Sequence, residues 1–327
     1  MLPLPVFQHH SPTSLVEALA LLVRLGDAAR LVAGGTDLLP NMKHGLVEPE
    51  HLVSLSRVDG LASIAVSDTH VELGAMTKLA DIAAHPEVGR HAPALAEATG
   101  AVGGPHHRRM GTLGGNVCLD TRCVYYNQTY FWREALGFCL KKDGSACHVV
   151  ASGKNCVAAA SNDSGPALIA LAAELELASP SGTRSVPAAE FYTPDGMANT
   201  VKRADEILTR VRVPRVVGRK SAFEKLRRRG AIDYPLLNAA ARVDRTSDGS
   251  IASVEVVVSA LAARPKRVKP TRPLVGNVAA EALVASYVEA AYKQCRPLTN
   301  LDNDTDWRRD MVRVVVERAL RRAAAVD

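Results

Sequence analysis

The sequence has few aromatic residues and no long apolar segment. Phe, Trp and Tyr make up 4% of its 327 residues, against 47% hydrophobic and 23% charged residues. This composition is typical of globular proteins, and the length allows two or three packed units. No apolar stretch approaches the ~20 residues that a membrane-spanning helix needs, and the N-terminal segment lacks the pattern of a secretory signal. We therefore expect a cytoplasmic protein with no membrane association.

The sequence also lacks the CxxC pairs that mark zinc ribbons and the compact cysteine run of ferredoxins. Instead Cys123, Cys139, Cys147 and Cys156 share one stretch, with 15, 7 and 8 residues between successive members. In a reducing cytosol, metal ligation or buried thiols are favoured over disulfides. The spacing leaves three alternatives open, namely a zinc ion, an iron–sulfur cluster or four unliganded thiols, and Cys118 could replace one of the four.

Neither the GxGxxG nor the P-loop pattern is present, yet two other glycine loops stand out. The first runs from Val32 to Leu38 and contains Gly34-Gly35, and the second runs from Gly111 to Asn116 and contains Gly114-Gly115. Adjacent glycines let backbone N–H groups converge on an anion without interference from Cβ atoms. Each loop alone is more typical of a plain turn, but two in one chain suit the pyrophosphate of a dinucleotide.

The pattern predicts three units, at 1–57, 58–217 and 218–327. The first is a small α/β unit with strands at 29–33 and 51–55 and a helix that begins after Ser14, which has capping-box spacing to Glu17. Its apolar face is expected to contain Leu15, Ala18, Leu19, Leu22 and Val23. The second mixes short strands and helices and contains the cysteine-bearing stretch at 118–156, which shows no clear period. The third is an α+β unit with a hairpin turn at Asp248-Gly249 and helices at 279–293 and 306–324.

Three motifs in order resemble one family. They are the first glycine loop, the run Leu73-Gly74-Ala75-Met76-Thr77, and the second glycine loop. Together they are similar to the FAD-binding subunit of molybdenum hydroxylases, the family of xanthine dehydrogenase and aerobic carbon monoxide dehydrogenase. The resemblance covers nearly the whole chain. It implies an α+β fold, with a two-part FAD-binding domain followed by a C-terminal domain that has a small antiparallel sheet and helices.

The resemblance also implies which residues bind FAD. The two glycine loops would hold the pyrophosphate, Asp163 would contact the flavin nucleotide, and Leu208 and Lys225 would line the side of the isoalloxazine ring. Ala101 and Val102 match the family approximately. The expected FAD-binding residues are Leu31, Val32, Ala33, Gly34, Gly35, Thr36, Asp37, Leu38, Ala101, Val102, Gly111, Thr112, Gly114, Gly115, Asn116, Asp163, Leu208 and Lys225.

The cysteine-bearing stretch reads as an insertion into that family's pattern. It resembles the extra loop of the β subunit of 4-hydroxybenzoyl-CoA reductase, which binds a [4Fe–4S] cluster beside the FAD domain. Carried over by position, the ligands are Cys123, Cys139, Cys147 and Cys156.

This resemblance implies an oxidoreductase subunit that transfers electrons. It would have no catalytic residue of its own. Reduced ferredoxin would donate the electrons. The expected partners are a molybdopterin-binding large subunit and a [2Fe–2S] small subunit, in a dimer of heterotrimers, and no nucleic acid. The alternative is the flavin subunit of an oxidative molybdenum hydroxylase with a structural zinc in the insertion.

Overall fold

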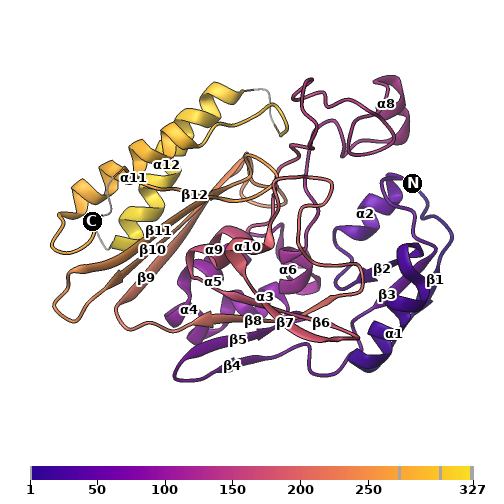
Figure 1. Ribbon diagram of the computed structural model, residues 1–327, viewed down its shortest axis with the longest axis horizontal. Helices are drawn as coiled ribbons and strands as arrows, with labels where there is room; N and C mark the ends of the chain where they lie inside the picture. Colours follow the sequence, from indigo (N-terminus) through magenta and orange to yellow (C-terminus); the bar gives the residue numbers. More distant parts are fainter. Residues whose placement is uncertain (1, 272–273, 302–303, 325–327) are drawn as a thin grey trace.

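The computed structural model describes residues 2–271, 274–301 and 304–324. The outer ends of the first and last expected units, residue 1 and residues 325–327, lie outside this part of the chain. Three separate sheets are arranged along the molecule. The cysteine-bearing stretch, which includes α8 (Tyr130–Ala135), projects from its body, as Figure 1 shows. The fold is α+β, as the sequence predicts.

The N-terminal unit is a parallel three-stranded sheet in the order β1-β3-β2, with helices beside it. The Oγ of Ser14 accepts a hydrogen bond from Glu17 N at 3.2 Å, which confirms the predicted helix start. Val23 is 59% exposed, so its predicted place on the buried face is wrong, and Leu21 is buried instead. The elements are β1 (Gln8–His10), α1 (Leu15–Leu25), η1 (Gly26–Ala28), β2 (Ala29–Val32), α2 (Leu38–Lys43) and β3 (His51–Ser54).

The middle unit is a five-stranded antiparallel sheet in the order β4-β5-β8-β6-β7. Its strands and helices share one apolar core, to which Leu73, Leu95, Leu168 and Val211 contribute. The strands are β4 (Ile64–Val66), β5 (His70–Gly74), β6 (Glu174–Ser179), β7 (Gly182–Pro187) and β8 (Ile207–Pro214). The helices are α3 (Leu79–Ala84), α4 (Pro86–His91), α5 (Pro93–Gly100), α6 (Pro105–Met110), α7 (Leu113–Val117), α9 (Ser164–Ala170) and α10 (Ala188–Phe191).

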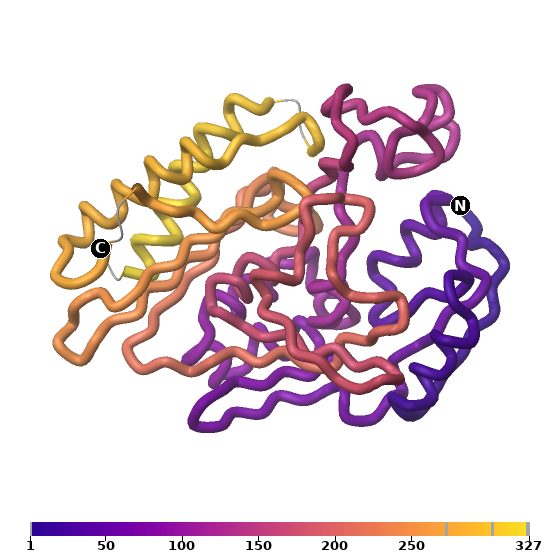
Figure 2. Tube along the Cα trace, in the orientation of Figure 1, coloured from indigo at the N-terminus to yellow at the C-terminus, as the bar shows by residue number. Residues whose placement is uncertain are grey.

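The insertion leaves this unit through a narrow neck. Arg122 and Ala159 exchange two backbone hydrogen bonds, of 2.8 and 2.7 Å, so the two ends of the insertion lie side by side. The tube in Figure 2 shows the stretch beyond the neck standing apart from the sheets. It was expected to have no regular structure, but it contains the short helix α8. Phe131 of α8 is 80% exposed, whereas Tyr126 is buried.

The C-terminal unit is an antiparallel sheet in the order β12-β11-β10-β9, packed against two helices. The predicted hairpin turn is present, and Gly249 adopts a φ of +84° there. Asn300 joins this unit to the neck of the insertion, because its backbone oxygen accepts from Val124 N and its side-chain amide donates to Val157 O, at 2.7 Å each. The elements are β9 (Arg219–Leu226), β10 (Leu237–Arg245), β11 (Ile251–Ser259), β12 (Lys266–Arg267), α11 (Ala280–Gln294) and α12 (Thr305–Ala324).

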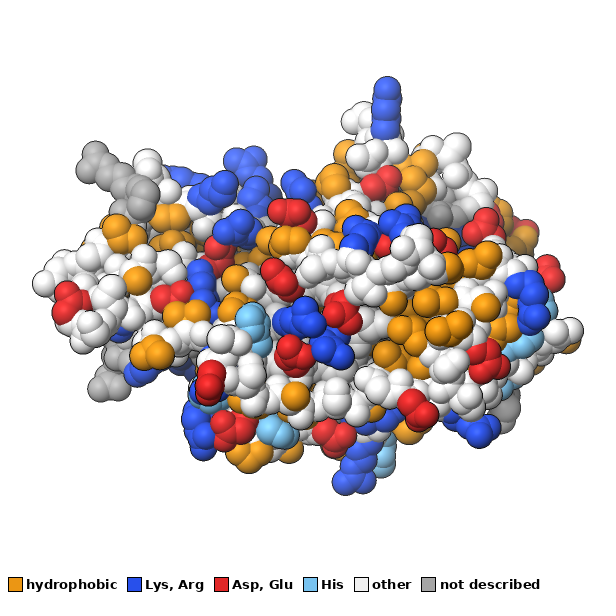
Figure 3. Space-filling model, turned by 60° about the horizontal axis from the view of Figure 1, so that its bottom comes forward, with side chains coloured by type: hydrophobic (Ala, Val, Ile, Leu, Met, Phe, Trp, Pro, Cys, Tyr) orange, Lys and Arg blue, Asp and Glu red, His pale blue; other side chains and the backbone are white. Residues whose placement is uncertain are grey.

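The surface carries charges of both signs. Lys and Arg side chains are interspersed with Asp and Glu over the face drawn in Figure 3. None of the helices in the described ranges combines the length and apolarity needed to cross a lipid bilayer.

Candidate functional site

A cavity of 1210 Å³ is lined by the N-terminal unit, the middle unit and the C-terminal unit together. Ligand cavities in proteins usually measure about 300–1,000 Å³, so this one has room for a large cofactor. Both glycine loops line it. The expected cofactor-binding residues that reach it are Leu31, Ala33, Gly34, Gly35, Thr36, Asp37, Leu38, Val102, Gly111, Thr112, Gly114, Gly115, Asn116, Asp163, Leu208 and Lys225.

Two expected residues do not line the cavity, namely Val32 and Ala101. Val32 is the last residue of β2 and pairs with Ser54 of β3. The carbonyl of Ala101 accepts hydrogen bonds from Lys225 Nζ at 3.0 Å and from Arg227 at 3.2 Å. The expected roles of Val32 and Ala101 in binding FAD therefore stay predictions, and the structure shows the Ala101 carbonyl holding the side chains of Lys225 and Arg227.

The first glycine loop follows β2 and lies against the end of α6. A Cβ on Gly34 would stand 2.1 Å from the carbonyl oxygen of Met110, so only glycine permits this approach. Gly35 adopts a φ of +69°, the left-handed region that favours glycine. From the sequence, these glycines were expected to give backbone N–H groups access to an anion. The structure shows that Gly34 also allows the two loops to pack against each other.

The second glycine loop is fixed by hydrogen bonds inside the protein. Thr112 caps α7, and its Oγ1 accepts from Gly115 N at 3.2 Å. Gly114 N donates to Ala75 O at 2.7 Å, and a Cβ on Gly114 would stand 2.8 Å from the Ala75 side chain. Asn116 Oδ1 accepts from the backbone and the hydroxyl of Ser164, at 3.1 and 2.5 Å. The loop is therefore rigid where it forms the cavity wall.

A buried ion pair lies on another wall of the cavity. Lys225 Nζ stands 2.6 Å from Asp163 Oδ2, and each side chain is 4% exposed. Asn238 Nδ2 donates to the other carboxylate oxygen at 2.9 Å. Burial raises the pKa of Asp163 and lowers the pKa of Lys225, and the attraction between the two charges opposes both shifts. The pair brings one buried ammonium and one buried carboxylate to the cavity.

Three polar side chains from distant parts of the chain meet at the cavity's edge. Tyr234 donates to Asp37 Oδ1 at 3.0 Å and accepts from Arg122 at 2.6 Å. Arg122 forms an ion pair with Asp37, and its guanidinium lies 4.3 Å from the centre of the Tyr234 ring. Sequence reasoning gave Arg122 no role, because the contact joins residues that lie far apart in the chain. All three side chains line the cavity.

The four cysteines of the insertion gather around a second, much smaller cavity of 20 Å³. All four are buried. Burial raises the pKa of the Cys123 thiol to about 12, and Cys156, Cys139 and Cys147 lie close enough to raise it further. Cys147 Sγ accepts from Val150 N and Cys156 Sγ from Ala158 N, both at 3.4 Å. Cys118 lies instead at the large cavity, and Cys295 belongs to the C-terminal core.

This cluster of sulfurs does not form the coordination sphere of a single ion. Among the residues that the structure describes, no three or more His, Cys, Asp or Glu side chains are arranged to hold one metal ion. A tetrahedral zinc with Zn–S bonds of ~2.3 Å requires sulfurs about 3.8 Å apart. Within the described residues, the four sulfurs lie together around the small cavity without forming such a set of ligands.

The two cavities share a wall. Tyr126 and Lys141 line both of them. Whatever occupies the small cavity is separated from the large cavity by these side chains and by the residues that hold them.

Comparison with known proteins identifies the family. Residues 5–216 match the family described as "FAD binding domain in molybdopterin dehydrogenase", and residues 221–323 match "CO dehydrogenase flavoprotein C-terminal domain". The chain belongs to the FAD-binding subunits of the molybdenum hydroxylase family. It is 31% identical over 327 residues to the carbon monoxide dehydrogenase medium chain of Hydrogenophaga pseudoflava, covering 99% of both chains. It is 32% identical over 243 residues to the aldehyde oxidoreductase FAD-binding subunit PaoB of Escherichia coli, covering 71% of this chain and 76% of that subunit.

Solved structures agree. Carbon monoxide dehydrogenase from Hydrogenophaga pseudoflava, in a form that lacks the Mo-pyranopterin moiety, matches with a TM-score of 0.78 at 30% identity, over 99% of both chains. Quinoline 2-oxidoreductase from Pseudomonas putida 86 matches with a TM-score of 0.77 at 26% identity, over 99% of this chain and 98% of that one. These likenesses establish the FAD subunit family. They do not show the more specific resemblance to 4-hydroxybenzoyl-CoA reductase.

Proposed function

We propose that this FAD subunit transfers electrons within a cytoplasmic complex that also contains a molybdopterin-binding large subunit and a [2Fe–2S] small subunit. The observation that carries the proposal is the 1210 Å³ cavity bordered by both glycine loops, in a chain of this family. FAD supplies the exchange of one or two electrons. The residues that line the cavity, Lys225 and Asp163 among them, would hold and orient the cofactor.

We further propose that Cys123, Cys139, Cys147 and Cys156 hold a [4Fe–4S] cluster. The four thiols are buried, line one small cavity and interact electrostatically. Two of the sulfurs accept backbone N–H bonds, which are among the features that tune iron–sulfur clusters.

With such a cluster, the reaction that we propose is that of a 4-hydroxybenzoyl-CoA reductase. The chain would take electrons from reduced ferredoxin at the insertion and pass them toward the molybdenum subunit. There, two electrons and two protons would replace the phenolic hydroxyl by hydrogen, releasing water and benzoyl-CoA. The chain itself would bind neither molybdenum nor the acyl-CoA.

A second candidate is the flavin subunit of an oxidative hydroxylase, with structural zinc in the insertion. The names of the relatives favour it, since they describe a carbon monoxide dehydrogenase, an aldehyde oxidoreductase and a quinoline oxidoreductase. The first candidate is supported by the resemblance of the cysteine-bearing stretch to the extra loop of the 4-hydroxybenzoyl-CoA reductase β subunit. The two differ in the content of the insertion and in the direction of electron flow.

The purified complex separates these candidates. FAD, iron, acid-labile sulfide and zinc are measured on one sample, and the complex is then assayed for benzoyl-CoA formation from 4-hydroxybenzoyl-CoA with reduced ferredoxin. We expect one FAD per chain, more iron and sulfide than the [2Fe–2S] subunit accounts for, and product formation. Stoichiometric zinc without the additional sulfide would favour the oxidative candidate, and absence of FAD would refute the electron-transfer role.

A further inference from the structure

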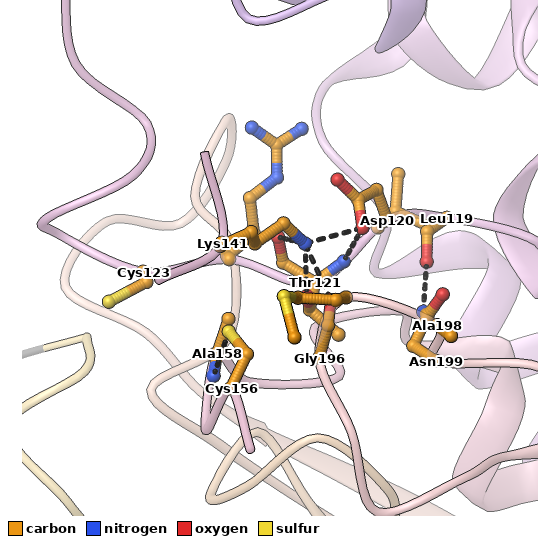
Figure 4. Close-up of polar contacts among 12 residues, drawn as sticks. Leu119, Asp120, Thr121, Cys123, Lys141, Cys156, Ala158, Gly196, Ala198 and Asn199 are labelled. Carbon is orange, nitrogen blue, oxygen red and sulfur yellow. Dashed lines mark hydrogen bonds and ion pairs between the residues drawn. The ribbon is translucent and has the colours of Figure 1, made fainter. Parts of the chain in front are cut away.

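Lys141 occupies the wall between the two cavities, although it belongs to the insertion. Its side chain is 6% exposed. The ammonium donates to Asp120 Oδ1 at 2.6 Å, to Thr121 Oγ1 at 2.6 Å and to Gly196 O at 2.7 Å. Figure 4 shows these three contacts converging on the Lys141 nitrogen, with Cys123 and Cys156 also in view.

The partners of Lys141 tie it to the sulfurs. A Cβ on Gly196 would stand 2.9 Å from Cys156 Sγ, so the peptide that accepts from Lys141 packs directly on this cysteine. Gly196 N also donates to Cys156 O at 2.8 Å. On its other side the ammonium lies 4.6 Å from the centre of the Tyr126 ring, which itself lines both cavities.

A buried lysine is costly unless its charge is satisfied. All three N–H bonds of Lys141 have acceptors, and one of these is a carboxylate, so the side chain is built to remain a cation. A glutamine could donate to only two of these acceptors, and an apolar residue could donate to none. The retained charge therefore calls for an electrostatic explanation.

We infer that Lys141 sets the reduction potential of the group held by the four cysteines. The inference rests on the proposed [4Fe–4S] cluster. Reduction by ferredoxin adds one electron, and so one negative charge, to the cluster and its four thiolates. A fixed cation nearby stabilises that more negative state and raises the potential, because charge interactions are strong where solvent is excluded. Lys141 acts by holding a positive charge near the cluster and does not itself bind iron.

Other charged side chains near this wall also contribute to the electrostatic potential at the four cysteines. Asp120 offsets the Lys141 charge in part, but its side chain is 38% exposed and solvent screens it. Lys142 is the next residue, also 38% exposed, and its Nζ lies 3.4 Å from Asp143. Lys142 lines only the large cavity, so it is a matched control for the loss of one positive charge in the same segment.

The test is a potentiometric titration of the purified complex, followed by EPR of the cluster, for wild type, Lys141→Met, Lys141→Arg, Asp120→Asn and Lys142→Met. Iron and sulfide are measured first. We expect Lys141→Met to retain the cluster and shift its potential downward, Lys141→Arg to restore it, and Asp120→Asn to shift it upward. The shift in Lys142→Met should be small and should vanish at high ionic strength, whereas that in Lys141→Met should persist.

Each other outcome is decisive. A wild-type complex without additional iron and sulfide refutes the proposed cluster itself. A cluster present with equal potentials in wild type and Lys141→Met, or equal shifts in Lys141→Met and Lys142→Met, overturns the role of Lys141. If Lys141→Met loses its iron, Lys141→Gln replaces it, since an amide can still donate to Gly196. Loss of iron from both neutral variants would show that Lys141 only maintains structure.

Discussion

Gly34 and Met110 are in direct backbone contact, although they lie 76 positions apart in the sequence. The carbonyl oxygen of Met110 lies 2.1 Å from the position that a Cβ on Gly34 would take, too close for any side chain. Through this contact the first glycine loop, from the N-terminal unit, lies against the segment that leads into the second. The FAD cavity therefore depends on two loops, of which the N-terminal unit supplies one and the middle unit supplies the other.

Replacing Gly34 by Ala should separate the loops and weaken FAD binding. A methyl group forced against backbone costs roughly 1–3 kcal/mol, which corresponds to a rise in Kd of about 5- to 150-fold. The measurement is the FAD content of the purified complex and the Kd of FAD for the deflavinated complex. Gly89→Ala is the control, because a Cβ on Gly89 of α4 meets nothing within 4 Å. Equal Kd values for the two variants would remove the role given to the Gly34–Met110 contact.

Tyr234→Phe should also weaken FAD binding, through loss of order in the first loop. The change removes the hydrogen bond to Asp37 and the one accepted from Arg122. Hydrogen bonds to charged groups contribute about 1.5–3 kcal/mol, but Tyr234 is 45% exposed, so we expect a rise in Kd of only ~3- to 10-fold. Fluorescence titration with FAD measures it. Tyr292→Phe serves as the control, since Tyr292 stacks with Arg309 and Arg313 away from the cavity. An unchanged Kd in Tyr234→Phe would mean that this contact does not order the loop.

Glu206 should make retention of FAD depend on pH. It precedes β8, whose Leu208 lines the cavity, and it is fully buried. Hydrogen bonds from Arg184, at 2.6 and 2.9 Å, lower the pKa of Glu206 below its usual 4.5. A carboxyl whose pKa falls on folding stabilises the fold above its unfolded pKa, and that contribution is lost as the pH falls through the folded pKa.

Glu206→Gln should therefore release FAD at a lower temperature than wild type at pH 7, and the difference should shrink as the pH falls below about 4.5. FAD fluorescence during heating measures the release. Glu190→Gln, at an exposed position, should match wild type throughout. A difference for Glu206→Gln that stays constant from pH 7 to pH 3.5 would show that the carboxylate charge is not responsible.

Local patterns in the sequence predict the elements with a strong period or a clear signal. The capped helix after Ser14 and the hairpin at Asp248-Gly249 are present because each is specified within a few residues. The short helices α4, α6 and α7 span five or six residues each, too few to show a period, and they were not predicted. The prediction for Val23 was wrong because the apolar face of the helix is wider than the part of that face that packs against the sheet.

The position of the cavity is predictable from two glycine loops, but its lining is only partly so. Arg122, Tyr234 and Asp37 meet through contacts across 112 and 197 residues, and no local pattern encodes them. The spacing of the four cysteines shows that they share a stretch. Their convergence depends on the neck at Arg122 and Ala159 and on Asn300 of another unit, which only the folded chain reveals.

The most direct test of the central claim is low-temperature EPR of the dithionite-reduced complex, with FAD measured on the same sample, for wild type, Cys139→Ala and Cys295→Ala. We expect a [4Fe–4S] signal beside those of the [2Fe–2S] subunit in wild type and in Cys295→Ala. Cys139→Ala should lose that signal alone and keep its FAD, because the two cavities are separate. Identical spectra for wild type and Cys139→Ala, with only [2Fe–2S] signals, would contradict it.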